Sequence, residues 1–189
     1  ANGPSEGVIR MSAFDVSGLD PKDCVSATPE IDFEAEQVQN FARQHCKGES
    51  AVEKSVSLYY AVRDLIKYDP YGIELSLDGL KASKALQIKS GWCVSKAILL
   101  AALLRLEGIP AALGFADVKN HLSTQKLREA MGTDIFMWHG YTSIWLDGAW
   151  VKATPAFNIE LCEKFRILPL EFVSKDKRLI IEENILHIF

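Results

Sequence analysis

Apolar residues recur with the period of a helix through the first half of the chain. Between Ser50 and Tyr68 they occupy positions 52, 56, 59, 62 and 66. This spacing predicts a helix that packs one face on a core. An earlier helix is predicted to begin at Thr28, as N-cap, with Pro29 in its first turn, and to run to about Cys46.

The segment from Cys93 to Glu107 is apolar on nearly every side. Such a pattern predicts a central helix that is buried on all its faces. Ser90 can cap its start, Gly108 suits the left-handed residue after its end, and Pro110 prevents its continuation.

The pattern then changes to that of strands, over residues 111–118, 136–146 and 149–154. The dipeptide Asp147-Gly148 between the last two is typical of a two-residue hairpin turn. Helices followed by strands indicate an α+β domain with an antiparallel sheet.

Shorter elements complete the prediction. Helices are expected over 122–131 and 158–165, and the tail 174–189 can add an edge strand. Residues 1–28 are rich in Gly, Pro, Ser and Asp, so we expect an irregular arm there, followed by a single domain over 29–189.

The composition, with 48% hydrophobic and 24% charged residues, is that of an ordinary globular protein. The net charge of −4 and the pI near 5.6 argue against nucleic acid or an anionic membrane as a partner. The longest apolar run, 97–104, is too short to span a bilayer.

Four cysteines are widely spaced along the chain, at Cys24, Cys46, Cys93 and Cys162. They form no CxxC pair and lie near no histidine at metal-ligand spacing, so no metal site and no cofactor are expected. The spacing predicts free thiols in a reducing, cytoplasmic setting; in an exported protein they could form two disulfides.

Cys93 is the strongest candidate for chemistry because it opens the predicted central helix. Unpaired N–H groups and the positive end of the helix dipole favour a thiolate, which predicts a lowered pKa for this cysteine. The same N–H groups can stabilise an oxyanion when the sulfur attacks a carbonyl. The alternative is that Cys93 is a small buried residue without a role in chemistry.

His139 is the natural base for this thiol. If Asp147-Gly148 is a two-residue turn, Leu146 faces Ala149, and His139 and Thr154 become diagonal neighbours about 7–8 Å apart at the backbone. Alternation places Gly140 and Thr142 on the opposite, mostly apolar face of the strand, which can pack on a layer of its own. The alternative interpretation is a structural histidine with its hydrogen bonds satisfied.

Two strings resemble the core motif of the transglutaminase-like superfamily, at 91–97 (GWCVSKA) and 103–111 (LLRLEGIPA). In that family a Gly-x-Cys opens a buried helix, and a Leu-Arg-x-x-Gly-Ile-Pro-Ala run ends it and enters the sheet. Residues 138–141 (WHGY) are similar to the family's histidine strand, and 148–151 (GAWV) to its return strand. Tyr68-Asp69-Pro70 also resembles the family's helix end.

The resemblance covers roughly residues 50–158, and the order of its motifs is more specific than any single one. It implies a papain-like cysteine-proteinase fold, with N-terminal helices and a buried Cys-bearing helix packed on an antiparallel sheet. It also implies a Cys-His-Asp triad for acyl transfer or amide hydrolysis.

The chain departs from the family at the third triad position, where Thr154 stands before Pro155 in place of an aspartate. Threonine can orient the imidazole, but it lacks the negative charge that stabilises an imidazolium. Papain-like enzymes manage with a neutral third member, so activity is compatible with Thr154. Asn158 is an alternative orienter if the chain bends back after Pro155.

We therefore expect a transglutaminase-like thiol enzyme that acts on amide bonds of a protein or peptide, with Cys93, His139 and Thr154 as catalytic residues. The alternative is a catalytically weak or inactive peptide-binding module with the same fold, which Thr154 favours. Trp92 and Trp138 flank the predicted site and are candidates for substrate binding. Gln87 has the spacing of an oxyanion-hole glutamine, although a solvated residue at a helix end is the preferred interpretation.

Overall fold

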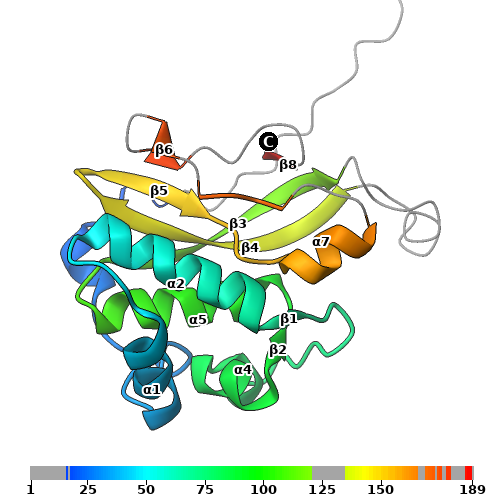
Figure 1. Ribbon diagram of the computed structural model, residues 1–189, viewed down its shortest axis with the longest axis horizontal. Coiled ribbons are helices and arrows are strands. Elements are labelled where there is room, and N and C mark those ends of the chain that lie inside the picture. The colour runs from blue at the N-terminus through cyan, green and yellow to red at the C-terminus, as the bar shows by residue number, and fades with distance from the viewer. Residues whose placement is uncertain are drawn as a thin grey trace, which may run out of the picture.

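The computed structural model describes residues 16, 18–120, 135–165, 169–172, 174–175, 178–179 and 186–188. Helices lie below an antiparallel sheet in the view of Figure 1, with α2 (Ala51–Leu65) and α5 (Cys93–Leu106) next to the sheet. Two further helices, α1 (Glu36–His45) and α4 (Ala82–Ile88), lie on the far side of α5 from the sheet. The fold is thus the mixed helical and antiparallel arrangement that the sequence predicts.

The sheet has the strand order β5-β4-β3-β8. Its members are β3 (Ala111–Asn120), β4 (Ile135–Leu146), β5 (Ala149–Ala153) and β8 (Leu186–Ile188). The predicted hairpin is confirmed, because Leu146 pairs with Ala149 across a turn in which Asp147 and Gly148 both have positive φ. The tail supplies an edge strand, because β8 pairs with β3.

The predicted central helix is confirmed as α5, which is buried from Cys93 to Leu104. It packs on the face of β4 that carries Gly140 and Thr142, where the Thr142 hydroxyl donates to the Ala97 carbonyl at 2.9 Å. Apolar burial of this helix against both the sheet and the other helices stabilises the fold. After its end, Gly108 has the expected left-handed φ of 71°.

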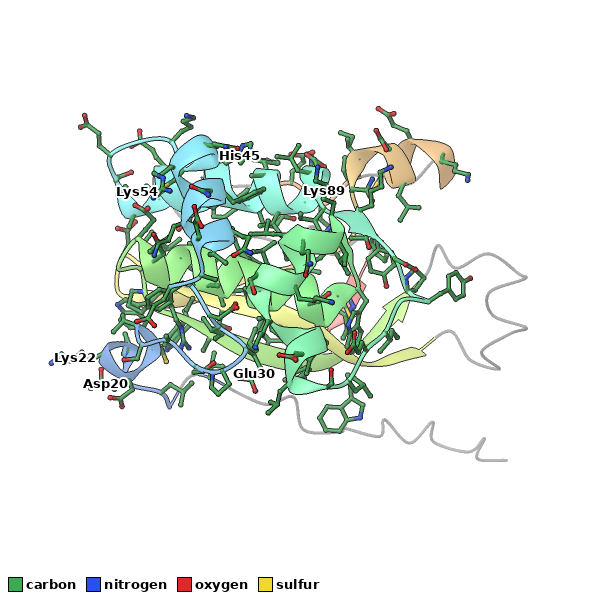
Figure 2. The ribbon with its side chains drawn as sticks, turned by 90° about the horizontal axis from the view of Figure 1, so that it is seen from below. Asp20, Lys22, Glu30, His45, Lys54 and Lys89 are labelled. Atoms are coloured by element: carbon green, nitrogen blue, oxygen red, sulfur yellow. The ribbon has the colours of Figure 1, made fainter. Side chains whose placement is uncertain are left out.

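The second predicted helix is confirmed as α2, with Ser50 as N-cap. Ser50 and Glu53 form a capping box in which each side chain accepts from the other's backbone N–H. Viewed from the helical side, the charged side chains of Lys22 and Lys54 lie at one edge of the molecule (Figure 2).

The prediction of a helix starting at Thr28 is wrong, because α1 begins only at Glu36. The Thr28 hydroxyl does accept the N–H of Ile31, but the chain then turns instead of winding into a helix. Residues 30 and 32 are used elsewhere: the Glu30 carbonyl accepts the N–H of Ala82, and the Asp32 carboxylate accepts from Ser83. These contacts position the start of α4 and take precedence over the local helix signal.

The predicted cap at Ser90 is also wrong. Trp92 is the N-cap of α5 and makes no side-chain cap hydrogen bond. Ser90 instead belongs to β2 (Ser90–Gly91), which pairs in parallel with β1 (Lys67–Tyr68). This two-residue ladder fixes the chain immediately before Cys93.

Remaining elements are short. They are a 3-10 helix η1 (Pro21–Cys24), α3 (Leu77–Leu80), α7 (Ile159–Phe165), β6 (Ser174–Lys175) and β7 (Arg178–Leu179). The helix predicted over 158–165 is therefore confirmed as α7, and the helix predicted over 122–131 lies outside the described residues. Within the described residues, no helix combines the length and apolar character needed to cross a membrane.

Candidate active site

Cys93 begins α5 and is nearly buried, with 8% of its surface exposed. The chain reaches it through Gly91, where a Cβ atom would lie 2.4 Å from the Ser95 hydroxyl oxygen. A larger residue there would force the Ser95 hydroxyl to rotate away, so Gly91 lets the loop before Cys93 pack closely on the first turn of the helix.

The sulfur of Cys93 lies against backbone N–H groups. Those of Gly140, Val94 and Cys93 itself favour the thiolate, but burial outweighs them and raises the pKa of the Cys93 thiol. The predicted lowering of this pKa is therefore wrong, because the helix terminus is closed off from water. The thiol rests in its neutral form.

Gly140 brings β4 into direct contact with the start of α5. A Cβ atom at Gly140 would lie 2.9 Å from Val94 Cα and 2.8 Å from its Cγ2. Residue 140, next to His139, thus has to be glycine if strand β4 is to approach the start of α5. Cys93 and His139 are thus close at the backbone, and the approach of the imidazole to the thiol stays a prediction.

His139 is 7% exposed, and its Nε2 atom is buried without a hydrogen-bond partner. Burial lowers the pKa of His139 to about 4, because no described group compensates the charge of an imidazolium. The imidazole is therefore neutral near pH 7 and keeps one ring nitrogen as a proton acceptor.

The register of β4 changes just before His139. Ala116 of β3 pairs with His139, whereas Val118 pairs with Phe136, so β4 carries one extra residue as a bulge. Trp138 lies in this bulge with a left-handed φ of 59°. Left-handed backbone at a bulky residue is strained, and such strain concentrates at functional sites.

Thr154 is buried directly after β5, and its carbonyl accepts from the Tyr59 hydroxyl at 3.1 Å. No hydrogen bond joins the side chains of Cys93, His139 and Thr154, all of which the structure describes. The three residues come from α5, β4 and the end of β5, and their cooperation as a triad stays a prediction.

Asn158, the alternative orienter, is buried and accepts the N–H of Tyr68 through Oδ1 at 3.1 Å. It ties the chain after β5 to β1. Tyr68 has no functional signal in the sequence beyond the resemblance of Tyr68-Asp69-Pro70 to a helix end. Burial raises the pKa of Tyr68, and the nearby Cys93 raises it further.

The two candidate substrate-binding tryptophans differ in exposure. Trp138 is 61% exposed and packs edge-on against Phe115, with ring centroids 6.3 Å apart. Trp92 is half-buried against the main core, so much of its ring contributes to packing and is not available to a substrate. Gln87 is exposed near the end of α4, in line with the preferred interpretation of a solvated residue.

All four cysteines are free. Among the described residues, no group of three or more His, Cys, Asp or Glu side chains is placed to hold a metal ion. The described site therefore consists of a thiol, a neutral imidazole and backbone N–H donors.

A thiol at the N-terminus of a buried helix, packed on an antiparallel sheet beside a histidine strand, defines the papain-like class of thiol-enzyme folds. The model of the transglutaminase-like superfamily matches residues 39–155, which is more than half of the chain. The chain belongs to the transglutaminase-like superfamily.

A similar fold is found in the crystal structure of a putative cysteine protease from Cytophaga hutchinsonii, with a TM-score of 0.58 and 18% sequence identity. The similarity covers 75% of this chain and 44% of that chain, so the present chain spans less than half of that protein's length. No curated protein matches the sequence.

Proposed function

We propose that this chain is a thiol enzyme that acts on amide bonds of a protein or peptide, with Cys93 as nucleophile and His139 as base. The observation that supports the proposal is the close approach of Gly140 to the first turn of α5, one residue along the chain from a buried His139 whose Nε2 has no partner. A buried imidazole with an unused acceptor is costly to stability, and proton transfer gives it a role.

The protonation states indicate how the reaction begins. Both groups rest neutral, so attack on the amide carbonyl is coupled to transfer of the thiol proton to His139. The new C–S bond forms as the carbonyl becomes an oxyanion, which the N–H of Cys93 stabilises. The C–N bond then breaks, the amine leaves with the proton from His139, and a thioester remains on Cys93.

The thioester passes to water or to a second amine. Water gives hydrolysis or deamidation, and a lysine amine gives a cross-link between proteins. The exposed ring of Trp138 next to the site suits an extended peptide with apolar side chains. Four free thiols fit a reducing compartment, and we propose a cytoplasmic location.

Alkylation of Cys93 by iodoacetamide tests the proposal, read peptide by peptide by mass spectrometry. In the wild type, Cys93 should be alkylated at neutral pH faster than its small fraction of thiolate alone would allow, because His139 assists as a base. His139→Ala should slow alkylation at about pH 7 by roughly 10²-fold and leave it unchanged at high pH, where the thiolate is already formed. Buried Cys162 is the internal control for global opening.

Casein is the probe substrate that shows whether water or an amine accepts the acyl group from Cys93. Incorporation of dansylcadaverine indicates transamidation, release of ammonia alone indicates deamidation, and new peptide termini indicate proteolysis. Cys93→Ala is the control for each readout. The enzyme proposal fails if Cys93 alkylation follows one thiol ionisation that His139→Ala does not alter.

A second candidate is a peptide-binding module that keeps the fold with little or no catalysis. The specific observation in its favour is Thr154 in the place of the family's acid, together with the raised pKa of the Cys93 thiol. Binding of casein fragments that is equal in the wild type and in Cys93→Ala, without turnover in either, would favour this candidate.

A further inference from the structure

A fully buried lysine lies one helical turn after Cys93. The Lys96 ammonium donates to the carbonyls of Arg63 at 2.9 Å, Ile66 at 2.6 Å and Ala156 at 2.8 Å. An ammonium has three hydrogens, so each of them has an acceptor. Nothing in the reaction proposed above uses this group.

The three acceptors come from two segments. Arg63 and Ile66 lie at the end of α2, where unpaired carbonyls and the helix dipole favour a cation. Ala156 lies two residues after Thr154, in the chain that leaves β5. Lys96 therefore joins the Cys93 helix to both.

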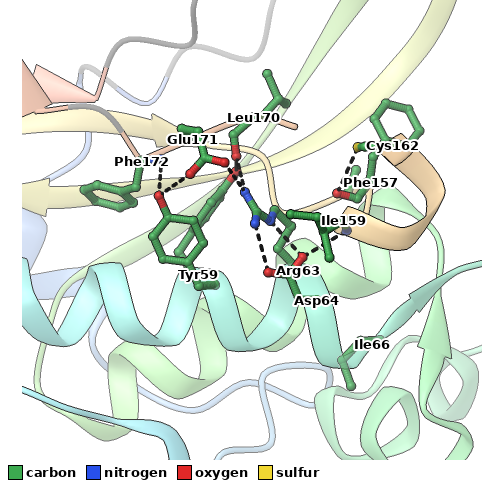
Figure 3. Close-up of polar contacts among 12 residues, drawn as sticks. Tyr59, Arg63, Asp64, Ile66, Phe157, Ile159, Cys162, Leu170, Glu171 and Phe172 are labelled. Atoms are coloured by element: carbon green, nitrogen blue, oxygen red, sulfur yellow. Dashed lines mark hydrogen bonds and ion pairs between the residues drawn. The ribbon is translucent and has the colours of Figure 1, made fainter. Parts of the chain in front are cut away.

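Charged groups around the ammonium act in both directions. Asp64 and the Cys162 thiol favour its charge, and the Arg63 guanidinium opposes it. Figure 3 shows Arg63 and Asp64 on α2 facing the chain at Ile159, with Ile66 one turn further along. Burial lowers the pKa of Lys96 to about 7, so the ammonium is fully protonated only in mildly acidic solution.

The chain over 154–158 is anchored at alternate residues. The Tyr59 hydroxyl donates to the Thr154 carbonyl, Lys96 to the Ala156 carbonyl, and the Tyr68 N–H to Asn158 Oδ1. Of these three bonds, the one from Lys96 comes from the helix that carries Cys93. The bond from Lys96 therefore holds α5, which carries Cys93, at a fixed distance from the segment that carries Thr154.

We propose that Lys96 is a positioning residue, which fixes segment 154–158 against the first turn of α5 so that Thr154 can support His139. This inference rests on the proposed function, because the position of Thr154 matters to chemistry only if His139 acts as a base. Without the ammonium, the Ala156 carbonyl loses its donor and the segment is free to shift away from the helix.

Hydrogen exchange tests the anchoring without reference to activity. At about pH 6, Lys96→Met should speed amide exchange in peptides covering 154–158 by ~10-fold or more, with little change in β4. Lys54→Met is the matched control, because Lys54 pairs with Glu107 at the opposite end of α5. If Lys96→Met does not fold, Lys96→Gln, which retains two N–H donors, carries the same measurement.

Iodoacetamide alkylation of Cys93 tests the link to chemistry. Lys96→Met should remove the base-assisted part of the rate between about pH 5 and 7 and leave the high-pH rate unchanged. Adding Thr154→Ala to Lys96→Met should then cost nothing further, whereas a purely structural lysine would give additive losses.

The outcomes separate the two proposals. Accelerated exchange at 154–158 with a non-additive double variant supports the positioning role. Unchanged exchange in that segment, or additive losses, overturns it. If His139→Ala leaves wild-type alkylation unaltered, the proposed function fails and the catalytic role of Lys96 falls with it, while the exchange result still decides whether the lysine anchors the segment.

Discussion

Gly140 of strand β4 lies directly against Val94, and this contact joins the strand to the first turn of helix α5. It exists because Gly140 has no side chain, so that Val94 can pack directly on the strand. The contact thus brings the chain beside Cys93 close to the chain beside His139, and the meeting of the two side chains stays a prediction.

Gly140→Ala should separate the strand from the helix, because its Cβ would lie 2.9 Å from Val94 Cα, which is backbone and cannot rotate away. We expect a loss of about 1–3 kcal/mol in the free energy of unfolding, measured in urea, and slower alkylation of Cys93 at neutral pH. Gly18→Ala is the control, because nothing lies within 4 Å of its added Cβ. Equal stability of both variants would contradict the contact.

Thr154→Asp should supply the charge that the family's third residue provides. A carboxylate beside the imidazole should raise the pKa of His139 by about 1–3 units, and this in turn favours the thiolate of Cys93. The pH midpoint of Cys93 alkylation should therefore fall by ~1 unit or more. Thr154→Asn is the neutral control and should leave the midpoint in place; identical profiles for both variants would place Thr154 out of reach of His139.

The sequence is informative where the pattern is local. The apolar run of α5 is buried whichever way neighbours pack, and Asp147-Gly148 determines its own turn, so both predictions are confirmed. The predicted helix start at Thr28 is wrong because the residues after it bind distant partners instead. The Glu30 carbonyl accepts the N–H of Ala82, and the Asp32 carboxylate accepts the N–H of Ser83.

The candidate site shows the same limit. Sequence spacing identifies Cys93 as the first residue of a helix, and with it the dipole that favours a thiolate. It does not reveal how completely the sheet closes over that end, and burial raises the pKa. Lys96 carried no signal because its three carbonyl acceptors come from segments 30 to 60 residues away in the chain.

Trp138 should show a strained backbone when its ring is removed. Trp138→Ala and Trp138→Gly lose the same contact with Phe115, but only glycine adopts a φ of 59° without cost. We expect the glycine variant to be more stable than the alanine variant by about 1 kcal/mol in urea unfolding. Both should raise the KM for casein with little change in kcat. A glycine variant that is no more stable than alanine would argue that the bulge relaxes.

His139 should make the protein sensitive to mild acid. Its folded pKa of about 4 lies below the ordinary value of 6.5, so between these values the unfolded chain binds more protons than the folded one. The free energy of unfolding contributed by this group should therefore be constant above about pH 6.5 and fall by up to ~1.4 kcal/mol per pH unit towards pH 4, on the order of 3 kcal/mol in all. Urea unfolding measured from about pH 7 to 4 checks this.

His139→Gln is the matched variant, because glutamine fills much of the same space and does not titrate. The difference in unfolding free energy between the wild type and this variant isolates the histidine from the carboxylates that also titrate in acid. His45→Gln is the control for a histidine that is only half-buried on α1. A wild-type curve parallel to that of His139→Gln across this range would mean that the imidazole is solvated or paired in solution, and the neutral, unpartnered base on which the mechanism depends would be lost.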